Sequence, residues 1–133
     1  MMQNRGGAVL VVTDLTPRSD AAVLAAGDLA RTHNIELYVL RTLELSNRPL
    51  REVLVSVEHI GEAIAQARTA VQAQVERLLP KDLHRNAPII EVDRRDVALR
   101  RCIQHISPSF VVYADGDEIV VRDQRDSTRA ISA

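Results

Sequence analysis

Cysteine and histidine are scarce in this sequence. Cys102 is the only cysteine among the 133 residues, so the chain cannot form a disulfide within itself. It lies on the apolar side of a predicted helix, which indicates a buried, unreactive thiol rather than a nucleophile. The four histidines fall in different predicted elements without the spacing of metal ligands, and no serine lies in a nucleophile-elbow motif. We therefore expect neither a bound metal ion nor enzymatic activity.

Long apolar runs and a strong charge of either sign are also missing. No apolar run approaches the ~20 residues that a helix needs to cross a bilayer, and residues 1–7 lack the apolar core of a secretory signal. The formal net charge of −1 gives no overall attraction to nucleic acids or to anionic membranes. We expect a cytoplasmic protein that binds neither. The length suits one domain with a single core, and we assign residues 1–133 to it.

The first third of the sequence contains two strand-like segments on either side of a helix-like one. Residues 8–13 form a short β-branched apolar run, typical of a strand covered on both faces. Thr16 is a suitable N-cap for the helix that follows, with Pro17 at its first position and Asn34 after its last turn. Residues 35–43 predict a second strand, which completes a right-handed, parallel βαβ unit. One helical stripe is expected to face inward: Ala22, Ala26, Leu29, Ala30 and His33.

The middle of the chain repeats this alternation. Residues 46–49 predict a loop, and a long helix follows that begins between residues 50 and 57 and ends before Pro80. Residues 89–92 and 110–114 predict two further strands, with a helix between them for which Asp93 is a suitable N-cap. The buried stripes are expected to be Val57, Ile60, Ile64, Ala67, Val71, Val75 and Leu78 in the long helix and Leu99, Cys102, Ile103 and Ile106 in the later one.

The end of the chain departs from the alternation. Asp115 and Gly116 lie between the fourth strand and a strand-like run at residues 118–122, and Asp-Gly between two strands predicts a tight antiparallel hairpin. The expected fold class is therefore α/β, an open, mostly parallel five-stranded sheet with helices on both faces. We expect residues 1–7 and 123–133 to be flexible.

The first strand and its turn, residues 11–16 (VVTDLT), resemble the universal stress protein family, whose members open with a strand that ends in Thr-Asp before a helix. Residues 36–41 are similar to the family's second strand, and residues 91–114 match in length and pattern. The resemblance covers about residues 8–114. It implies an open α/β domain that forms dimers and acts in the stress response.

The same resemblance implies a nucleotide site in part of the family. In its ATP-binding members, the aspartate after the first strand contacts the nucleoside, and a residue at the end of the second strand lines the adenine pocket. These roles would fall to Asp14 and Thr42. From the residues alone, Asp14 is equally a turn residue that accepts backbone hydrogen bonds, and Thr42 has a residue type that is common at strand ends.

The part of the family motif that holds the phosphates is absent. ATP-binding members carry Gly-x-x-Gly, nine further residues and then Gly-Ser or Gly-Thr after the fourth strand, where backbone N–H groups converge on phosphate oxygens. Here the first two glycine positions fall on Ala114 and Asp117, and no glycine follows Gly116. The carboxylates of Asp115, Asp117 and Glu118 would repel a triphosphate. We therefore expect a member of this family that does not bind ATP.

Two charged clusters suggest alternatives. One cluster consists of four arginines on the predicted third helix: Arg94, Arg95, Arg100 and Arg101. It predicts a solvated, ion-paired helix face, and the more specific alternative is a site for an anion or an acidic partner. The lack of interleaved aromatic residues argues against single-stranded nucleic acid. The hairpin carboxylates lack the further ligands of a calcium loop. A phosphoacceptor role for Asp14 has little support, because the acidic pocket and lysine of such regulators have no counterpart.

The sequence favours a non-enzymatic regulatory or interaction protein of the stress response, without a cofactor. The apolar last strand, at an edge of the sheet, would be covered in a homodimer, and a protein partner is possible. The alternative function is adenine-nucleotide binding, of ATP or AMP, through Asp14 and Thr42.

Overall fold

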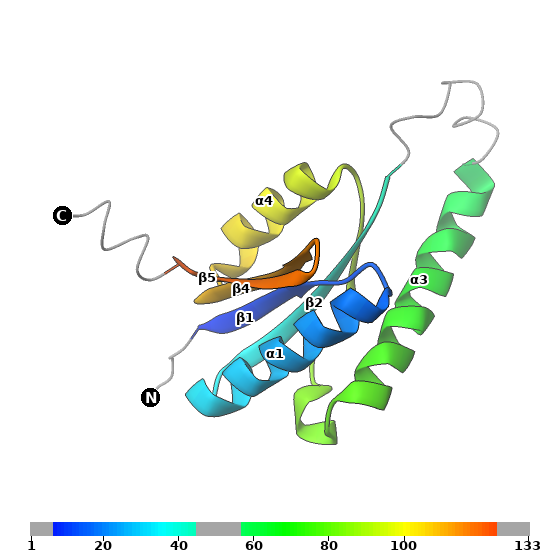
Figure 1. The fold of residues 1–133 in the computed structure, drawn as a ribbon. Helices are drawn as coiled ribbons and strands as arrows, with labels where there is room; N and C mark the ends of the chain where they lie inside the picture. The colour runs from blue at the N-terminus through cyan, green and yellow to red at the C-terminus, as the bar shows by residue number, and fades with distance from the viewer. Residues whose placement is uncertain (1–6, 45–56, 125–133) are drawn as a thin grey trace.

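The fold is an open sheet between two layers of helices (Figure 1). The computed structural model describes residues 7–44 and 57–124. In chain order the elements are β1 (Ala8–Val12), α1 (Pro17–His33), β2 (Glu36–Leu43), α3 (Val57–Leu78), the 3₁₀ helix η2 (Lys81–Leu83), β3 (Ile89–Val92), α4 (Arg95–Ile106), β4 (Phe110–Asp115) and β5 (Glu118–Asp123). The predicted loop at 46–49, any helical turn before Val57 and the terminal residues 1–6 and 125–133 lie outside the described residues.

The five strands form one sheet in the order β3-β2-β1-β4-β5. β1 pairs in parallel with both β2 and β4, β2 pairs in parallel with β3, and β4 pairs with β5 in antiparallel register. The predicted fold class is confirmed, including the antiparallel hairpin. Its turn residues are Gly116 and Asp117, because Asp115 is the last residue of β4 and pairs with Glu118. The last strand is one residue longer than predicted, because Asp123 still pairs with Phe110.

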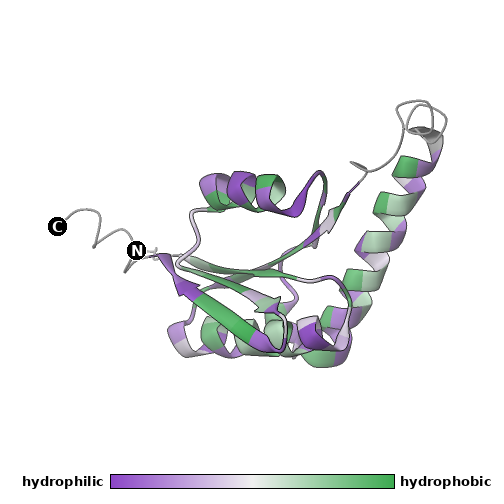
Figure 2. Ribbon diagram, turned by 45° about the horizontal axis from the view of Figure 1, so that its top comes forward, coloured by the Kyte–Doolittle hydropathy of each residue, from purple (hydrophilic) through white to green (hydrophobic). Residues whose placement is uncertain are grey.

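The helices cover the two faces of the sheet unequally. Figure 2 shows α4 alone above the sheet, with α1 and α3 on the other side. On the side of α1, Val9 and Val11 of β1 belong to the larger buried cluster, while on the other side Leu10 packs in the cluster that contains Cys102 of α4. Cys102 is buried as predicted, and this burial, followed by the charge of Glu91, raises the pKa of its thiol.

The predicted ends of α1 are confirmed. Thr16 is extended and its side chain accepts a hydrogen bond from the N–H of Ser19, with Pro17 at the start of the helix. Asn34 takes the left-handed conformation that ends the helix, at φ 55°. The inward position predicted for His33 is wrong. Its side chain is exposed in the last turn, beyond the edge of the core, with its ring centroid 4.9 Å from that of Phe110.

Helix α3 follows its predicted stripe, with one polar exception. Ala67, Val71 and Val75 are buried, and Ile60, Ile64 and Leu78 are half-buried. Gln74 lies among them with only 3% of its surface exposed. Its amide oxygen accepts a hydrogen bond from the hydroxyl of Thr13 at 2.8 Å, and its amide nitrogen donates to Asp20 Oδ1 at 2.7 Å. Gln74 therefore joins α3 to the end of β1 and to the first turn of α1.

The start of α4 differs from its prediction. The N-cap is Arg94, which has no capping side chain, and Asp93 is not the cap. Asp93 Oδ1 instead accepts a hydrogen bond from the N–H of Arg94 at 2.8 Å, and its other oxygen pairs with Arg101. The N–H of Arg95 donates to Glu44 Oε1 at 3.0 Å, so a carboxylate from the end of β2 satisfies the first turn of α4. This contact fixes Arg95 beside the carboxyl ends of the strands.

Candidate functional site at the carboxyl ends of the strands

The carboxyl ends of β1, β2 and β4 meet at the point where the sheet order reverses, which is the usual ligand site of open α/β sheets. Asp14 follows β1, Thr42 lies near the end of β2 and Ala114 near the end of β4. All three line one cavity of about 40 Å³. The fold thus brings Asp14 and Thr42 together. The cavity is large enough for water, whereas ligand pockets measure roughly 300–1,000 Å³.

Asp14 is held by its own turn. Its Oδ1 atom accepts hydrogen bonds from the N–H and the hydroxyl of Thr16. Partial desolvation acts to raise the pKa of Asp14, but these hydrogen bonds from Thr16, with a smaller one from Ser19, outweigh it and leave the pKa below its usual value. The next residue, Leu15, has φ 67° and donates its N–H to the buried hydroxyl of Thr13. Asp14 is therefore an ionised carboxylate in a fixed, partly exposed position.

The hairpin occupies the place where a phosphate loop would follow β4. Gly116 takes φ 62° at the turn, and its carbonyl oxygen accepts a hydrogen bond from Arg18 of α1 at 3.1 Å. Asp115, Asp117 and Glu118 are all exposed at this turn. Because β5 begins at Glu118, no helix follows β4 within the described residues, and so no helix N-terminus points at the cavity from this side.

Two arginines that the sequence did not indicate as a pair also line this cavity. Arg41 projects from β2 and Arg95 from the start of α4. Arg95 is exposed, as predicted for a solvated helix face, but it has no ion pair among the described residues, and its guanidinium lies over the ring of Tyr113, 5.3 Å from the ring centroid. Arg95 also lines two larger cavities, one of about 470 Å³ beside α3 and one of about 480 Å³ beside β4 and β5. No sequence motif relates the two arginines, because 54 positions separate them.

Two other arginines of the cluster, Arg94 and Arg101, form ion pairs as predicted, whereas Arg100 has no ion pair among the described residues. Arg101 pairs with Glu91 at 2.6 Å and with Asp93 at 2.8 Å, and Arg94 pairs with Asp96 at 3.7 Å. The hydrogen bond from Arg101 is the largest of the effects that lower the pKa of Asp93. Among residues 7–44 and 57–124, no group of three or more histidine, cysteine or acidic side chains is arranged to hold a metal ion.

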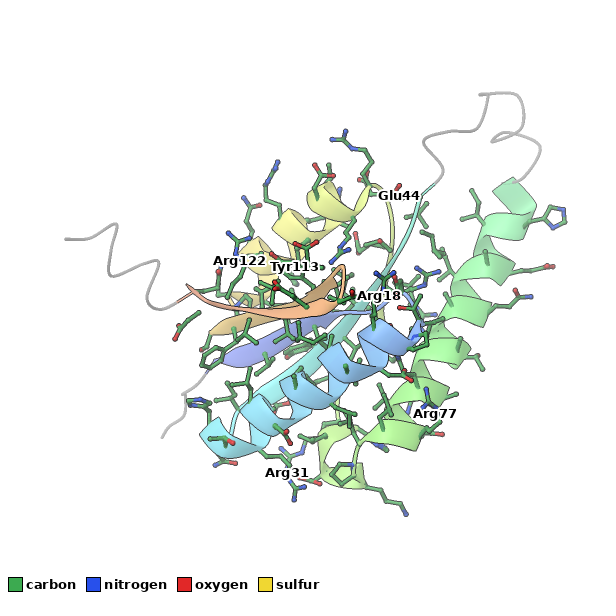
Figure 3. The ribbon with its side chains drawn as sticks, viewed as in Figure 1. Arg18, Arg31, Glu44, Arg77, Tyr113 and Arg122 are labelled. Carbon is green, nitrogen blue, oxygen red and sulfur yellow. The ribbon has the colours of Figure 1, made fainter. Side chains whose placement is uncertain are left out.

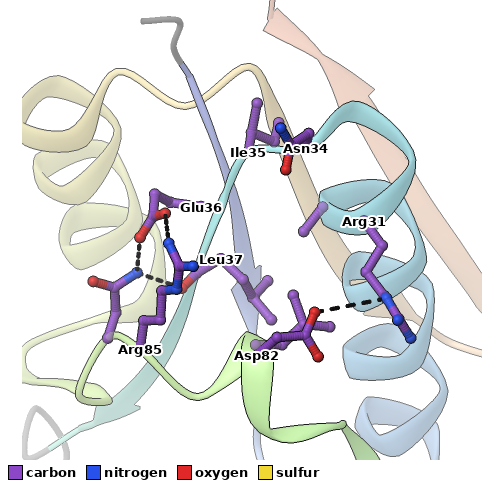
Figure 4. Close-up of a pocket in the computed structure, with 10 residues that line it drawn as sticks. Arg31, Asn34, Ile35, Glu36, Leu37, Asp82 and Arg85 are labelled. Atoms are coloured by element: carbon purple, nitrogen blue, oxygen red, sulfur yellow. Dashed lines mark hydrogen bonds and ion pairs between the residues drawn. The ribbon is translucent and has the colours of Figure 1, made fainter. Parts of the chain in front are cut away.

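A further cavity, of about 390 Å³, lies at the opposite, amino ends of the strands (Figure 4). Its charged side chains pair with one another: Arg31 with Asp82 at 3.8 Å, and Arg85 with Glu36 at 3.5 Å. Since these charges already have partners and the cavity lies away from the switch point of the sheet, it is the weaker candidate for a ligand site.

Fold and site together define an open α/β domain with a polar crevice at its topological switch point. A family model, described as the universal stress protein family, matches residues 7–106. The chain belongs to that family. The match ends with α4, so the hairpin of β4 and β5 lies beyond it. No curated protein matches the sequence significantly.

Solved structures of the same fold are distant in sequence. Universal stress protein UspA from Lactobacillus plantarum is similar with a TM-score of 0.67 and 18% identity, over 84% of this chain and 78% of the other. A universal stress family protein from Burkholderia pseudomallei gives 0.57 and 17%, over 95% and 88%. A universal stress protein in complex with cAMP gives 0.51 and 17%, over 79% and 69%.

Within the described residues, no helix combines the length and apolarity needed to span a membrane.

Proposed function

We propose that this chain is a non-enzymatic regulatory protein of the stress response that binds a protein partner and does not bind ATP. The hairpin carries the proposal: β4 turns at Gly116 and Asp117 directly into β5. A triphosphate needs several N–H groups or cations that converge on its oxygens. At this position the chain instead offers exposed carboxylates, whose repulsion opposes phosphate binding in a partly desolvated crevice.

The test of ATP binding is a thermal unfolding scan with ATP, ADP and AMP, each with and without Mg²⁺. A ligand at a hundred times its Kd stabilises a protein by about 2.7 kcal/mol, which a melting curve resolves easily. We expect no shift with millimolar ATP. A clear upward shift would show that the proposal is wrong. A variant with Asp115→Asn, Asp117→Asn and Glu118→Gln separates the two causes, because it removes the repulsion but restores no glycine loop.

Adenine-nucleotide binding through Asp14 and Thr42 is the second candidate. Its support is the cavity that both residues line, together with the two arginines beside it. The similar protein solved in complex with cAMP suggests nucleotides with few phosphate groups as ligands. If AMP or cAMP raises the melting temperature, Asp14→Ala should abolish the shift. Asp96→Ala, which removes an exposed carboxylate on α4 away from this cavity, should leave it unchanged.

We also propose a homodimer that forms through β5. This strand lies at one edge of the sheet, and its apolar Val121 is 46% exposed. Antiparallel pairing of two β5 strands around a two-fold axis would satisfy their outer backbone groups. Light scattering should give the mass of a dimer at micromolar concentration. Val121→Lys should yield monomers, whereas Leu24→Lys, at a similarly exposed residue of α1, should not. A monomeric wild-type chain would refute this arrangement.

A further inference from the structure

Arg41 is the one arginine among residues 7–44 and 57–124 that is half-buried, and the others are exposed. Five described arginines lie within 4.0 Å of a carboxylate: Arg31, Arg77, Arg85, Arg94 and Arg101. Arg41 is half-buried but has no described carboxylate within that distance. One terminal nitrogen of Arg41 donates a hydrogen bond to the carbonyl oxygen of Thr42 at 3.1 Å. Its Nε atom is buried without an acceptor among the described residues. Partial burial of a cation without a counter-charge costs free energy. Arg41 is therefore suited to bind an anionic ligand.

Arg95 faces the same space from the other side. Together with Arg41 and Thr42 it lines the cavity of about 470 Å³ beside α3. Arg95 also has no described ion pair, and its guanidinium is kept in place by the ring of Tyr113. Figure 3 shows this region between the end of β2, marked by Glu44, and the upper part of α3. Two arginines from separate elements thus line one cavity.

The rest of the cavity wall is mostly apolar. Leu43 of β2, Ile60 and Ala63 of α3 and Val92 of β3 line it. A volume of about 470 Å³ lies within the range of small-molecule sites, which combine apolar walls with a few polar groups that orient the ligand. The third charged group is Glu44, whose carboxylate already accepts the N–H of Arg95. With two cations and one anion, the lining carries a net charge of +1, which matches a ligand of charge −1.

We propose that this cavity binds a small apolar monocarboxylic acid. The two arginines hold the carboxylate, Arg41 as the half-buried group and Arg95 as the group at the rim. The apolar body of the ligand lies between Ile60 and Ala63 on α3 and Val92 on β3. This cavity shares Arg41, Thr42 and Arg95 with the cavity that Asp14 lines, but the apolar walls from α3 and β3 belong to the larger cavity and Asp14 to the smaller. Asp14→Ala should therefore leave the binding of the acid unchanged.

The test is a titration of the full chain with 1-naphthoate, in which NMR follows the chemical shifts of the protein, including the arginine Nε–Hε signals. We expect saturable binding and a shift of the Arg41 Nε–Hε signal. The neutral 1-naphthamide and the small anion acetate should each bind at least about tenfold more weakly, because each lacks one half of the recognised chemistry. Arg41→Gln and Arg95→Gln should each raise the Kd for 1-naphthoate at least about tenfold, the loss of a hydrogen bond to a charged group.

Arg100→Gln is the matched control, since it removes the same charge from an exposed position of α4 that does not line the cavity. It should leave the Kd unchanged. Ala63→Phe keeps both arginines but fills the cavity, and it should also prevent binding. The proposal is overturned if 1-naphthoate fails to bind at about 5 mM, a concentration far above the Kd expected for a ligand of this size. It is equally overturned if 1-naphthamide binds as tightly, or if Arg100→Gln weakens binding as much as Arg95→Gln. Arg95 is exposed, so its variant tests the site even where Arg41→Gln fails to fold.

Discussion

Gln74→Leu tests whether the buried hydrogen bonds of α3 hold this helix against the crevice. Gln74 is the one buried polar side chain of α3 among the described residues, and it bridges Thr13 of β1 and Asp20 of α1. Leucine has a similar size and helix propensity, so the substitution changes little besides these two hydrogen bonds. The hydroxyl of Thr13 has a single proton, which in the wild type points to the amide oxygen of Gln74 or to Ser19, 3.0 Å away.

The expected cost follows from what each partner can do afterwards. Loss of an acceptor for a buried donor costs about 1–3 kcal/mol, and Thr13 falls at the low end because its proton can turn to Ser19. Asp20 keeps the two contacts from Arg77, at 3.0 and 3.1 Å, so the loss of its hydrogen bond from Gln74 costs about 0.5–1.5 kcal/mol. The larger apolar surface of leucine offsets about 1 kcal/mol. We therefore expect Gln74→Leu to lower the free energy of unfolding by about 0.5–1.5 kcal/mol.

The assay is urea unfolding followed by far-UV circular dichroism, since the chain has no tryptophan for fluorescence. Gln72→Leu is the control on the same helix: its amide bonds only to Glu76 at the surface, so the change should stay within about 0.5 kcal/mol. Thr13→Val and the double variant complete a double-mutant cycle. The double variant should lose about 1 kcal/mol less stability than the sum of the losses in the two single variants. Equal costs at positions 72 and 74, or strict additivity, would refute the role given to this network.

Three further outcomes follow from local geometry. Gly116→Ala should lower stability by about 1–2 kcal/mol in thermal melts, because Gly116 has φ 62°, whereas Gly116→Asn should cost less; nothing lies within 4 Å of an added Cβ, so the difference reports the backbone alone. Asp14→Asn should make stability less sensitive to acid: the lowered pKa means that ionised Asp14 favours the folded state above the usual pKa, and that this contribution disappears as the pH falls through the lowered value, below about pH 4. Gly27→Val should cost about 1–3 kcal/mol by the same melts, because an added Cβ would lie 2.6 Å from Cδ2 of Leu79, the residue that follows α3. An unchanged melting temperature of either glycine variant, or an acid dependence of Asp14→Asn equal to that of the wild type, would contradict the corresponding account.

The backbone of this fold could be predicted because its signals are local. The β-branched run before Asp14, the N-cap at Thr16 and the Asp-Gly turn at Gly116 each act within a few residues, and each is confirmed. The N-cap predicted at Asp93 failed for the opposite reason. Glu44, 51 positions before Arg95 in the chain, supplies the carboxylate at the first turn of α4, and a local pattern contains no trace of that contact.

The site could be predicted only where a motif named its residues. Asp14 and Thr42 follow from the family resemblance, and they do line one cavity. Arg41 was read as part of a strand and Arg95 as part of a solvated helix face, because only the parallel pairing of β2 and β3 and the entry into α4 bring the two side chains together. The buried Gln74 was missed for the same reason, since a polar residue inside an apolar stripe is interpretable only once its partners are known.

The reversal of the chain after β4 explains both why α4 alone covers one face of the described sheet and why we propose that the chain does not bind ATP. A parallel fifth strand would need a crossover of a dozen or more residues, normally a helix, whereas Gly116 and Asp117 reverse the chain at once. Without that helix, α4 alone covers its face of the described sheet, and the amides that would hold a triphosphate have no helix to orient them. The cavity between α3 and β3 lies wholly within the part that matches the family, residues 7–106, so it is independent of this reversal. A chain that exchanges its phosphate loop for a hairpin can therefore still bind a small acid through Arg41 and Arg95, and the two binding experiments will separate these properties.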